Sequence, residues 1–155
     1  MSVGISELFE MLDWNSDEET QKKGIEEGSK IEYISIFMQP IENKGIWENC
    51  AKIIVQKSDE KLRGYMIFLL EWLQDANWPG FNIIYNRIKA MPVKLISFYY
   101  ARSIRKAAGI EDEMWLVYLA SLSTNKELYE SLSNKEKEII DNYMREGIEF
   151  SKNFD

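Results

Sequence analysis

Apolar side chains recur at intervals of three and four residues along almost the whole chain, whereas strand-like alternation is nearly absent. The segments 62–73 and 93–107 show this helical spacing most clearly. At 155 residues, of which 45% are apolar, the chain has the size and the material of one domain with its own core. We therefore predict a single all-α domain over residues 1–155.

Short polar motifs place the ends of the expected helices. Ser16 followed by Glu19 forms a predicted capping box, and the helix that it starts turns from polar to apolar and ends at Pro40. Pro79 fits the first turn of a later helix, because that position needs no N–H donor. Gly109 is the expected C-cap of the helix before it.

The helical segments also match one another at a fixed offset. A shift of 33 residues brings Ala51 onto Ile84 and Leu62 onto Leu95. A second shift brings Leu95 onto Leu128. Because a repeat of this length is typical of helical arrays, we predict a right-handed stack of about four helix pairs instead of a closed four-helix bundle.

Charge is unevenly distributed along the chain. The net charge is −7 over residues 1–75, +6 over residues 76–110 and −6 over residues 111–155. The basic segment contains no Asp or Glu, and its cations are Arg87, Lys89, Lys94, Arg102, Arg105 and Lys106. Two interpretations stay open: these cations pair with carboxylates on neighbouring helices, or they form a face that binds a phosphate backbone or an acidic protein.

The composition disfavours most enzymatic chemistry. Histidine is absent, which excludes Ser-His-Asp and Cys-His nucleophiles and the usual zinc sites. Cys50 is the single cysteine, and it lies in an apolar stripe, where we expect a small buried hydrophobe. We predict no catalytic residue, no metal site and no cofactor. An enzyme that uses carboxylates far apart in sequence remains an alternative.

Two acidic runs, residues 26–27 and 111–113, are expected to be solvated helix faces. The first residues lack a basic region followed by an apolar core, as a signal peptide would require. The longest apolar run, residues 66–70, is much shorter than a membrane span. We expect a cytoplasmic protein without a membrane partner.

The tight turn after residue 74 supplies the first candidate contact residues. We expect Trp72 to pack inside and Trp78, flanked by Asp75 and Asn77, to be an exposed aromatic at a binding surface. Asp75 is also expected to brace the turn with its carboxylate. The predicted partner-binding residues are Asp75, Asn77, Trp78, Arg102, Arg105 and Lys106.

The run from Trp72 to Gly80, with the pattern WLQD-x-NWPG, resembles the bacterial DUF5071 family. Similarity extends over roughly residues 20–122. The resemblance implies a HEAT-like α–α superhelix. It implies no catalytic residues, because none is established for the family. Small acidic helical-repeat proteins of this kind often act as immunity proteins against bacterial toxins, an analogy between folds.

Two functional hypotheses follow. The first is a protein-binding, non-enzymatic helical-repeat protein, such as an immunity-type inhibitor whose partner is a bacterial toxin; an acidic binder suits a basic partner. The second is a nucleic-acid-associated protein that uses the basic helix pair 87–106. It requires the six cations to lie unpaired on one exposed face.

Overall fold

The fold is all-α, as the sequence predicts, and the computed structural model describes residues 3–39 and 42–154. Pro40, where a helix was expected to end, lies outside the described residues. The α-helices are α1 (Ile5–Leu12), α2 (Glu18–Ser29), α3 (Trp47–Ile54), α4 (Asp59–Arg63), α5 (Met66–Glu71), α6 (Phe81–Lys89), α7 (Val93–Gly109), α8 (Glu113–Leu122), α9 (Lys126–Glu130), α10 (Asn134–Asp141) and α11 (Met144–Ser151). The 3₁₀ helices are η1 (Ile34–Phe37), η2 (Lys44–Ile46), η3 (Trp72–Gln74) and η4 (Lys152–Phe154).

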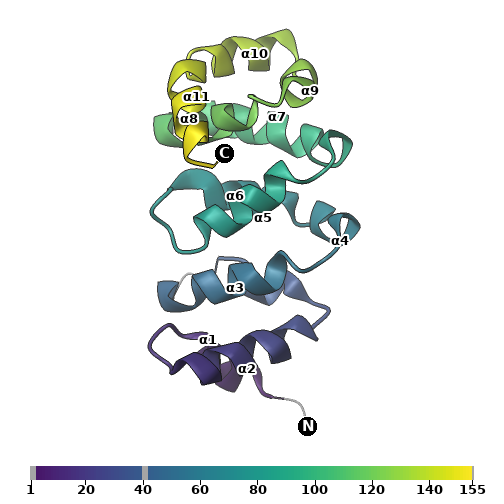
Figure 1. Ribbon diagram of the computed structural model, residues 1–155. Coiled ribbons are helices and arrows are strands. Elements are labelled where there is room, and N and C mark those ends of the chain that lie inside the picture. The colour runs from purple at the N-terminus through teal and green to yellow at the C-terminus, as the bar shows by residue number, and fades with distance from the viewer. Residues whose placement is uncertain (1–2, 40–41, 155) are drawn as a thin grey trace.

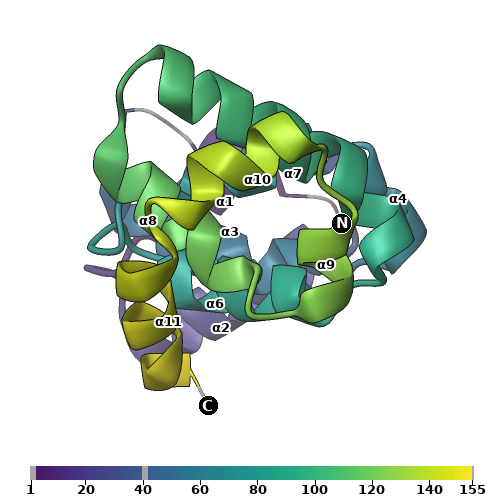
Figure 2. The ribbon, with the colours of Figure 1, turned by 90° about the horizontal axis from the view of Figure 1, so that it is seen from above.

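Consecutive helices pair, and the pairs stack in one direction from α1 and α2 to α10 and α11 (Figure 1). The pairs are α1 with α2, η1 with α3, α5 and η3 with α6, α7 with α8, and α10 with α11. Seen along the stack, α7 and α11 lie on opposite sides (Figure 2). The 33-residue offset relates helices in contact, namely α3 with α6, α4 with α7, and α7 with α9.

Large aromatic side chains fill the core between the layers, and their polar atoms are hydrogen-bonded. Trp72, Tyr100 and Trp115 are fully buried. The Trp72 Nε1–H donates to the Pro79 carbonyl (3.0 Å), the Trp115 Nε1–H to the Leu70 carbonyl (3.1 Å) and the Tyr100 hydroxyl to the Leu119 carbonyl (2.6 Å). Burial raises the pKa of Tyr100, so its hydroxyl remains a donor. Each ring thus contributes apolar area without an unpaired donor.

The helix expected to extend from residue 20 to Pro40 ends at Ser29. Lys57 accounts for this end, because its Nζ donates to the carbonyls of Ser29 (2.9 Å) and Ile31 (3.1 Å). A lysine that binds the free carbonyls at a helix C-terminus stabilises that end. The chain then re-forms a short helix, η1, which supplies one pair beyond the expected four.

Two helices start later in the chain than expected. Asp17, not Ser16, is the N-cap of α2, and its carboxylate accepts from the Thr20 N–H at 2.8 Å. The Ser16 hydroxyl instead donates to a carbonyl of α1. α6 begins at Phe81, with Gly80 as its N-cap at a φ of 85°, so Pro79 precedes the helix instead of lying in its first turn. A complete capping box does occur, but at Ser133.

A close helix contact joins α11 to α8 at Gly147. A Cβ built on Gly147 would lie 2.8 Å from the Ser121 backbone nitrogen and 2.9 Å from the Ala120 Cβ. Backbone atoms cannot move away as a flexible side chain can. Because Gly147 has no side chain, α11 can pack directly against α8.

We predict opposite effects for two Gly→Ala substitutions. Alanine in a helix is normally favoured over glycine by up to about 1 kcal/mol, and Gly109, with nothing within 4 Å of its Cβ position, should follow this rule. Gly147→Ala should instead destabilise the protein by about 1–3 kcal/mol through overpacking. Urea unfolding followed by circular dichroism measures both; equal effects would contradict the packing described.

Candidate interaction surface

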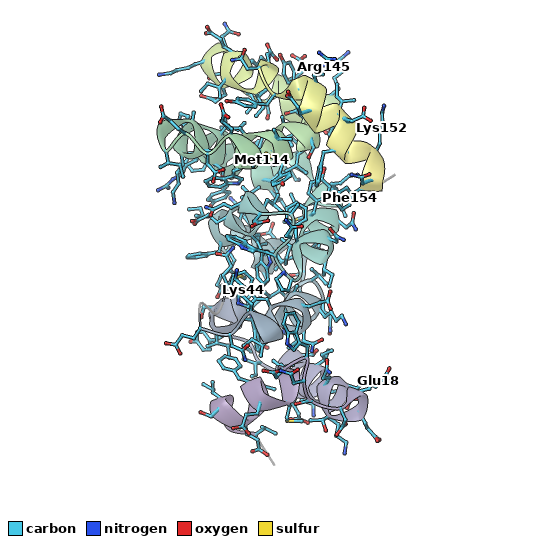
Figure 3. All side chains as sticks on the ribbon, turned by 90° about the vertical axis from the view of Figure 1, so that its left-hand side faces the viewer. Glu18, Lys44, Met114, Arg145, Lys152 and Phe154 are labelled. Atoms are coloured by element: carbon cyan, nitrogen blue, oxygen red, sulfur yellow. The ribbon has the colours of Figure 1, made fainter. Side chains whose placement is uncertain are left out.

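The turns within successive helix pairs lie along one side of the stack, which we call the turn edge (residues 13–16, 43–46, 75–80 and 110–114). Figure 3 faces this edge and labels Lys44 and Met114 at two levels of it. Consecutive turns touch: the Trp14 N–H donates to the Gly45 carbonyl at 3.0 Å, and the Lys44 Nζ lies 5.9 Å from the Trp78 ring centroid. The first three turns are therefore in contact with one another, and the fourth turn lies on the same side of the stack.

The first three turns share a local hydrogen bond in which an Asp or Asn side chain accepts from the N–H two residues later. The pairs are Asp13 with Asn15 (2.8 Å), Asn43 with Gly45 (2.9 Å) and Asp75 with Asn77 (2.8 Å). The Asn43 Nδ2 also donates to Asp13 at 2.9 Å, and this bond lowers the pKa of the Asp13 carboxyl. Asp75 thus braces its turn as predicted, and the same hydrogen bond occurs in the two turns before it.

A cluster of tryptophans anchors the third turn. Trp47 packs edge-on against buried Trp72 at 5.8 Å and against Trp78 at 5.4 Å between ring centroids. The Lys44 Nζ lies 5.7 Å from the Trp47 ring, within cation–π range. A Cβ on Gly80 would lie 2.9 Å from the Ala51 Cβ, so only glycine fits where the turn meets α3. These contacts fix the turn rigidly on the core.

The fourth turn is held by the end of α7. Gly109, expected as the C-cap, is the last residue of the helix, and Glu111 takes the left-handed conformation with a φ of 57°. The N–H groups of Glu111 and Asp112 donate to the Ala108 (3.1 Å) and Ala107 (2.9 Å) carbonyls, the two bonds of a Schellman motif. A glutamate occupies the position that usually holds glycine, and its side chain is exposed.

The exposed apolar residues of the edge differ from those expected. Trp78 is half-buried against Trp47, so it is not the exposed aromatic that the sequence indicated. Trp14 is 56% exposed, Ile110 58% and Met114 53%. Asp13 and Asp75 make the same hydrogen bond in their turns. This repetition in the sequence could have indicated that Trp14, like Trp78, lies at the turn edge.

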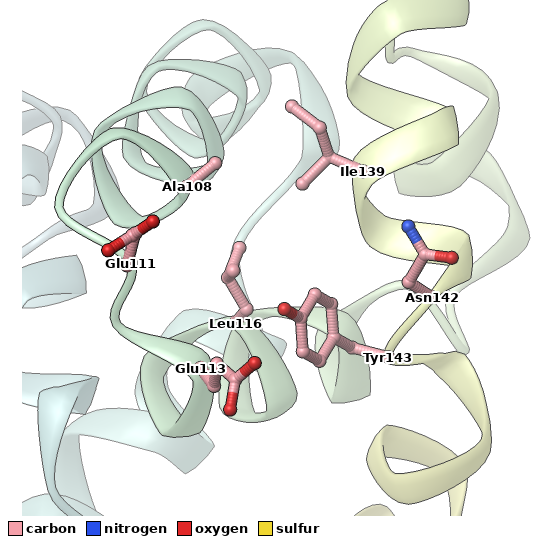
Figure 4. A pocket seen from close by; sticks show the side chains of 7 residues that line it. All are labelled: Ala108, Glu111, Glu113, Leu116, Ile139, Asn142 and Tyr143. Atoms are coloured by element: carbon pink, nitrogen blue, oxygen red, sulfur yellow. The ribbon is translucent and has the colours of Figure 1, made fainter.

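A pocket of about 500 Å³ opens beside the fourth turn (Figure 4). Its lining residues are Ala108, Glu111, Glu113, Leu116, Ile139, Asn142 and Tyr143. Figure 4 shows Glu111 and Glu113 on one side and Asn142 and Tyr143 on the other, with Leu116 between them. Carboxylates beside an apolar wall suit a cation on an aliphatic stem, such as a lysine or arginine side chain.

Half of the basic segment is engaged within the protein. The ion pairs are Arg87 with Asp59 (2.7 Å), Arg105 with Glu136 (3.3 Å) and Lys106 with Glu71 (3.2 Å). Arg87 also donates to two backbone carbonyls. Among the described residues, Lys94 and Arg102 have no carboxylate within 4.0 Å. Of the predicted contact residues, Arg102 is therefore free of ion pairs, whereas Arg105 and Lys106 brace neighbouring layers.

The predicted contact residues form two groups on different elements. Asp75, Asn77 and Trp78 belong to the turn edge. Arg102 lies on the exposed face of α7, away from the turn at the end of that helix. The structure therefore provides two surfaces where the sequence suggested one set of residues.

The single cysteine, Cys50, is buried. Burial raises the pKa of the Cys50 thiol to about 12, so it stays protonated and unreactive near neutral pH. Within residues 3–39 and 42–154, no three His, Cys, Asp or Glu side chains are grouped closely enough to hold a metal ion. No helix in the same residues has the length and apolar character needed to cross a membrane.

Comparison with known families matches residues 44–148 to DUF5071, a domain of unknown function. The chain belongs to this family. The match covers α3 with Trp47, the turn with Trp78, all of α7 and the residues that line the pocket. It begins and ends later than the range 20–122 over which the resemblance was noted. Comparisons with curated proteins and with solved structures found no match for this DUF5071 chain.

The Glu136 carboxylate generates a pH prediction. Its pKa is lowered from 4.5, first by a hydrogen bond from Ser133 and then by Arg105. A lowered folded-state pKa gives stability that is present above the unfolded-state pKa and lost as pH falls through the folded-state value. Glu136→Gln should therefore cost stability at pH 7, by about 1 kcal/mol, and cost less below about pH 4.5.

Urea unfolding at a series of pH values measures this difference. Glu127→Gln is the matched control, because Glu127 is exposed and has no ion pair among the described residues. Its unfolding free energy should follow the wild type at every pH. A cost of Glu136→Gln that stays constant down to pH 3 would contradict the account of the Arg105 contact.

Proposed function

We propose that this DUF5071 chain is a non-enzymatic protein-binding module whose contact surface is the turn edge. The observation that supports this most is the exposure of Trp14, Ile110 and Met114 at turns that are fixed by hydrogen bonds. Apolar anchors on a rigid frame bind with little loss of conformational entropy. Such residues, surrounded by polar side chains, are typical of interaction hot spots.

The charge of the protein favours a basic partner. The net charge is −7, and the pocket beside Ile110 presents Glu111 and Glu113 next to apolar walls. A basic side chain of the partner would fill this pocket while its apolar residues cover the exposed anchors. Complementary charge also speeds association. We propose an immunity-type inhibitor of a basic bacterial toxin, acting in the cytoplasm, as the most specific form of this function.

The nucleic-acid alternative loses support. It requires six unpaired cations on one face, but Arg87, Arg105 and Lys106 are engaged in ion pairs. A chain of net charge −7 would also be repelled by a phosphate backbone at long range.

Affinity purification from the native host tests the proposal. The wild-type chain should retain one basic protein in stoichiometric amount. Trp14→Ala combined with Met114→Ala should weaken binding to that protein at least about tenfold in calorimetry, because both anchors are lost. Tyr33→Ala combined with Phe68→Ala is the control, since it removes two exposed apolar residues outside the turn edge.

The immunity form of the proposal is tested by co-expression. If the retained protein arrests growth, wild type and control should restore growth and the Trp14/Met114 variant should not. Equal binding by the edge and control variants would contradict the turn edge as contact surface. A retained protein that does not arrest growth would contradict only the immunity form.

A further inference from the structure

The exposed face of α7 carries a row of residues with one chemical character, which we call the α7 stripe (Lys94, Phe98 and Arg102). Residues four apart lie on the same face of a helix. Phe98 is 66% exposed, and its ring packs edge-on against Tyr99 at 5.3 Å. An exposed phenylalanine thus lies between two cations.

The cations of the stripe lack the partners that their neighbours have. Further along α7, Arg105 pairs with Glu136 of α10 and Lys106 pairs with Glu71 of α5. Lys94 and Arg102 have no such carboxylate in the described part of the chain, and α7 itself contains no acidic residue. The cations near the C-terminus of α7 are therefore paired with carboxylates, whereas those of the stripe have no such pair among the described residues.

We propose that the α7 stripe is a second docking site, for an acidic segment of a protein. An apolar side chain of that segment covers Phe98, and carboxylates on either side bind Lys94 and Arg102. The two cations are eight residues apart, about 12 Å along the helix axis. Acidic residues about two turns apart on a partner helix match this spacing.

This site is independent of the proposed function of the turn edge. The fourth turn of the edge, residues 110–114, follows the C-terminal end of α7 at Gly109, whereas the stripe begins at Lys94, near the N-terminal end of the helix. The two surfaces also have opposite charge, so they select partners of opposite charge. Substitutions that abolish binding at one surface should therefore leave binding at the other surface unchanged.

An acidic protein segment fits the stripe better than a nucleic acid does. Nucleic-acid binding gains its strength from many phosphate contacts, whereas the stripe offers two cations that have no ion pair among the described residues. The acidic segments on both sides of the basic block would repel an extended phosphate backbone. A short acidic segment with one apolar residue needs only the three side chains of the stripe.

Selection from a phage-displayed library of random 16-residue peptides tests the proposal on the full chain. We expect enriched peptides to carry Asp or Glu on both sides of an apolar residue. Lys94→Gln combined with Arg102→Gln, and separately Phe98→Ala, should reduce the affinity of the enriched peptides about tenfold in fluorescence anisotropy. All three substitutions are at exposed positions, and circular dichroism verifies that the variants fold.

Lys22→Gln combined with Lys23→Gln is the matched control, because it removes two exposed cations from α2 and gives the same net charge. It should bind the peptides as the wild type does. Several outcomes would overturn the proposal: no acidic enrichment, equal losses in stripe and control variants, or tighter binding of a 20-residue oligothymidylate than of the peptides. Self-association of the wild type that the stripe variants abolish, seen by sedimentation, would also overturn it.

Discussion

The packing of the 72–80 turn against α3 is the contact on which the described surfaces depend. Trp72 is buried, and its Nε1–H donates a hydrogen bond to the Pro79 carbonyl. The turn is therefore held over the Trp72 ring. Gly80 then lies so close to Ala51 that no side chain fits between them. Because the turn is fixed to the layer below, Trp78, Trp47 and their neighbours form one rigid edge instead of separate mobile loops.

The stack separates two kinds of surface. The turn edge combines exposed apolar side chains with the carboxylates of the pocket, whereas the exposed face of α7 is cationic and aromatic. A stack of helix pairs permits this division, because each pair contacts only its neighbours. A side chain in a turn or on an exposed helix face therefore shapes one surface and leaves the other layers in place. The ion pairs of Arg105 and Lys106 show where basic residues serve the stack itself.

The sequence predicted the all-α class, the repeat and the buried Trp72, because periodic apolar residues and a long-range offset determine them. It did not predict the end of α2, which depends on Lys57 from a later layer. Nor could it tell Arg102 from Arg105, because Glu136 is distant in sequence. The prediction that Trp78 is exposed was wrong for the same reason, because exposure depends on neighbouring side chains and the Trp47 ring packs against Trp78.

The stacked layers bury three tryptophans and leave one exposed at the turn edge. ¹⁹F NMR of the chain labelled with 5-fluorotryptophan tests it, with resonances assigned by Trp→Phe variants and a soluble paramagnetic agent reporting exposure. Trp14 should broaden strongly and Trp78 partly, while Trp47, Trp72 and Trp115 should be protected. Broadening of Trp72 or Trp115, or protection of Trp14, would contradict the arrangement and the binding surface built on it.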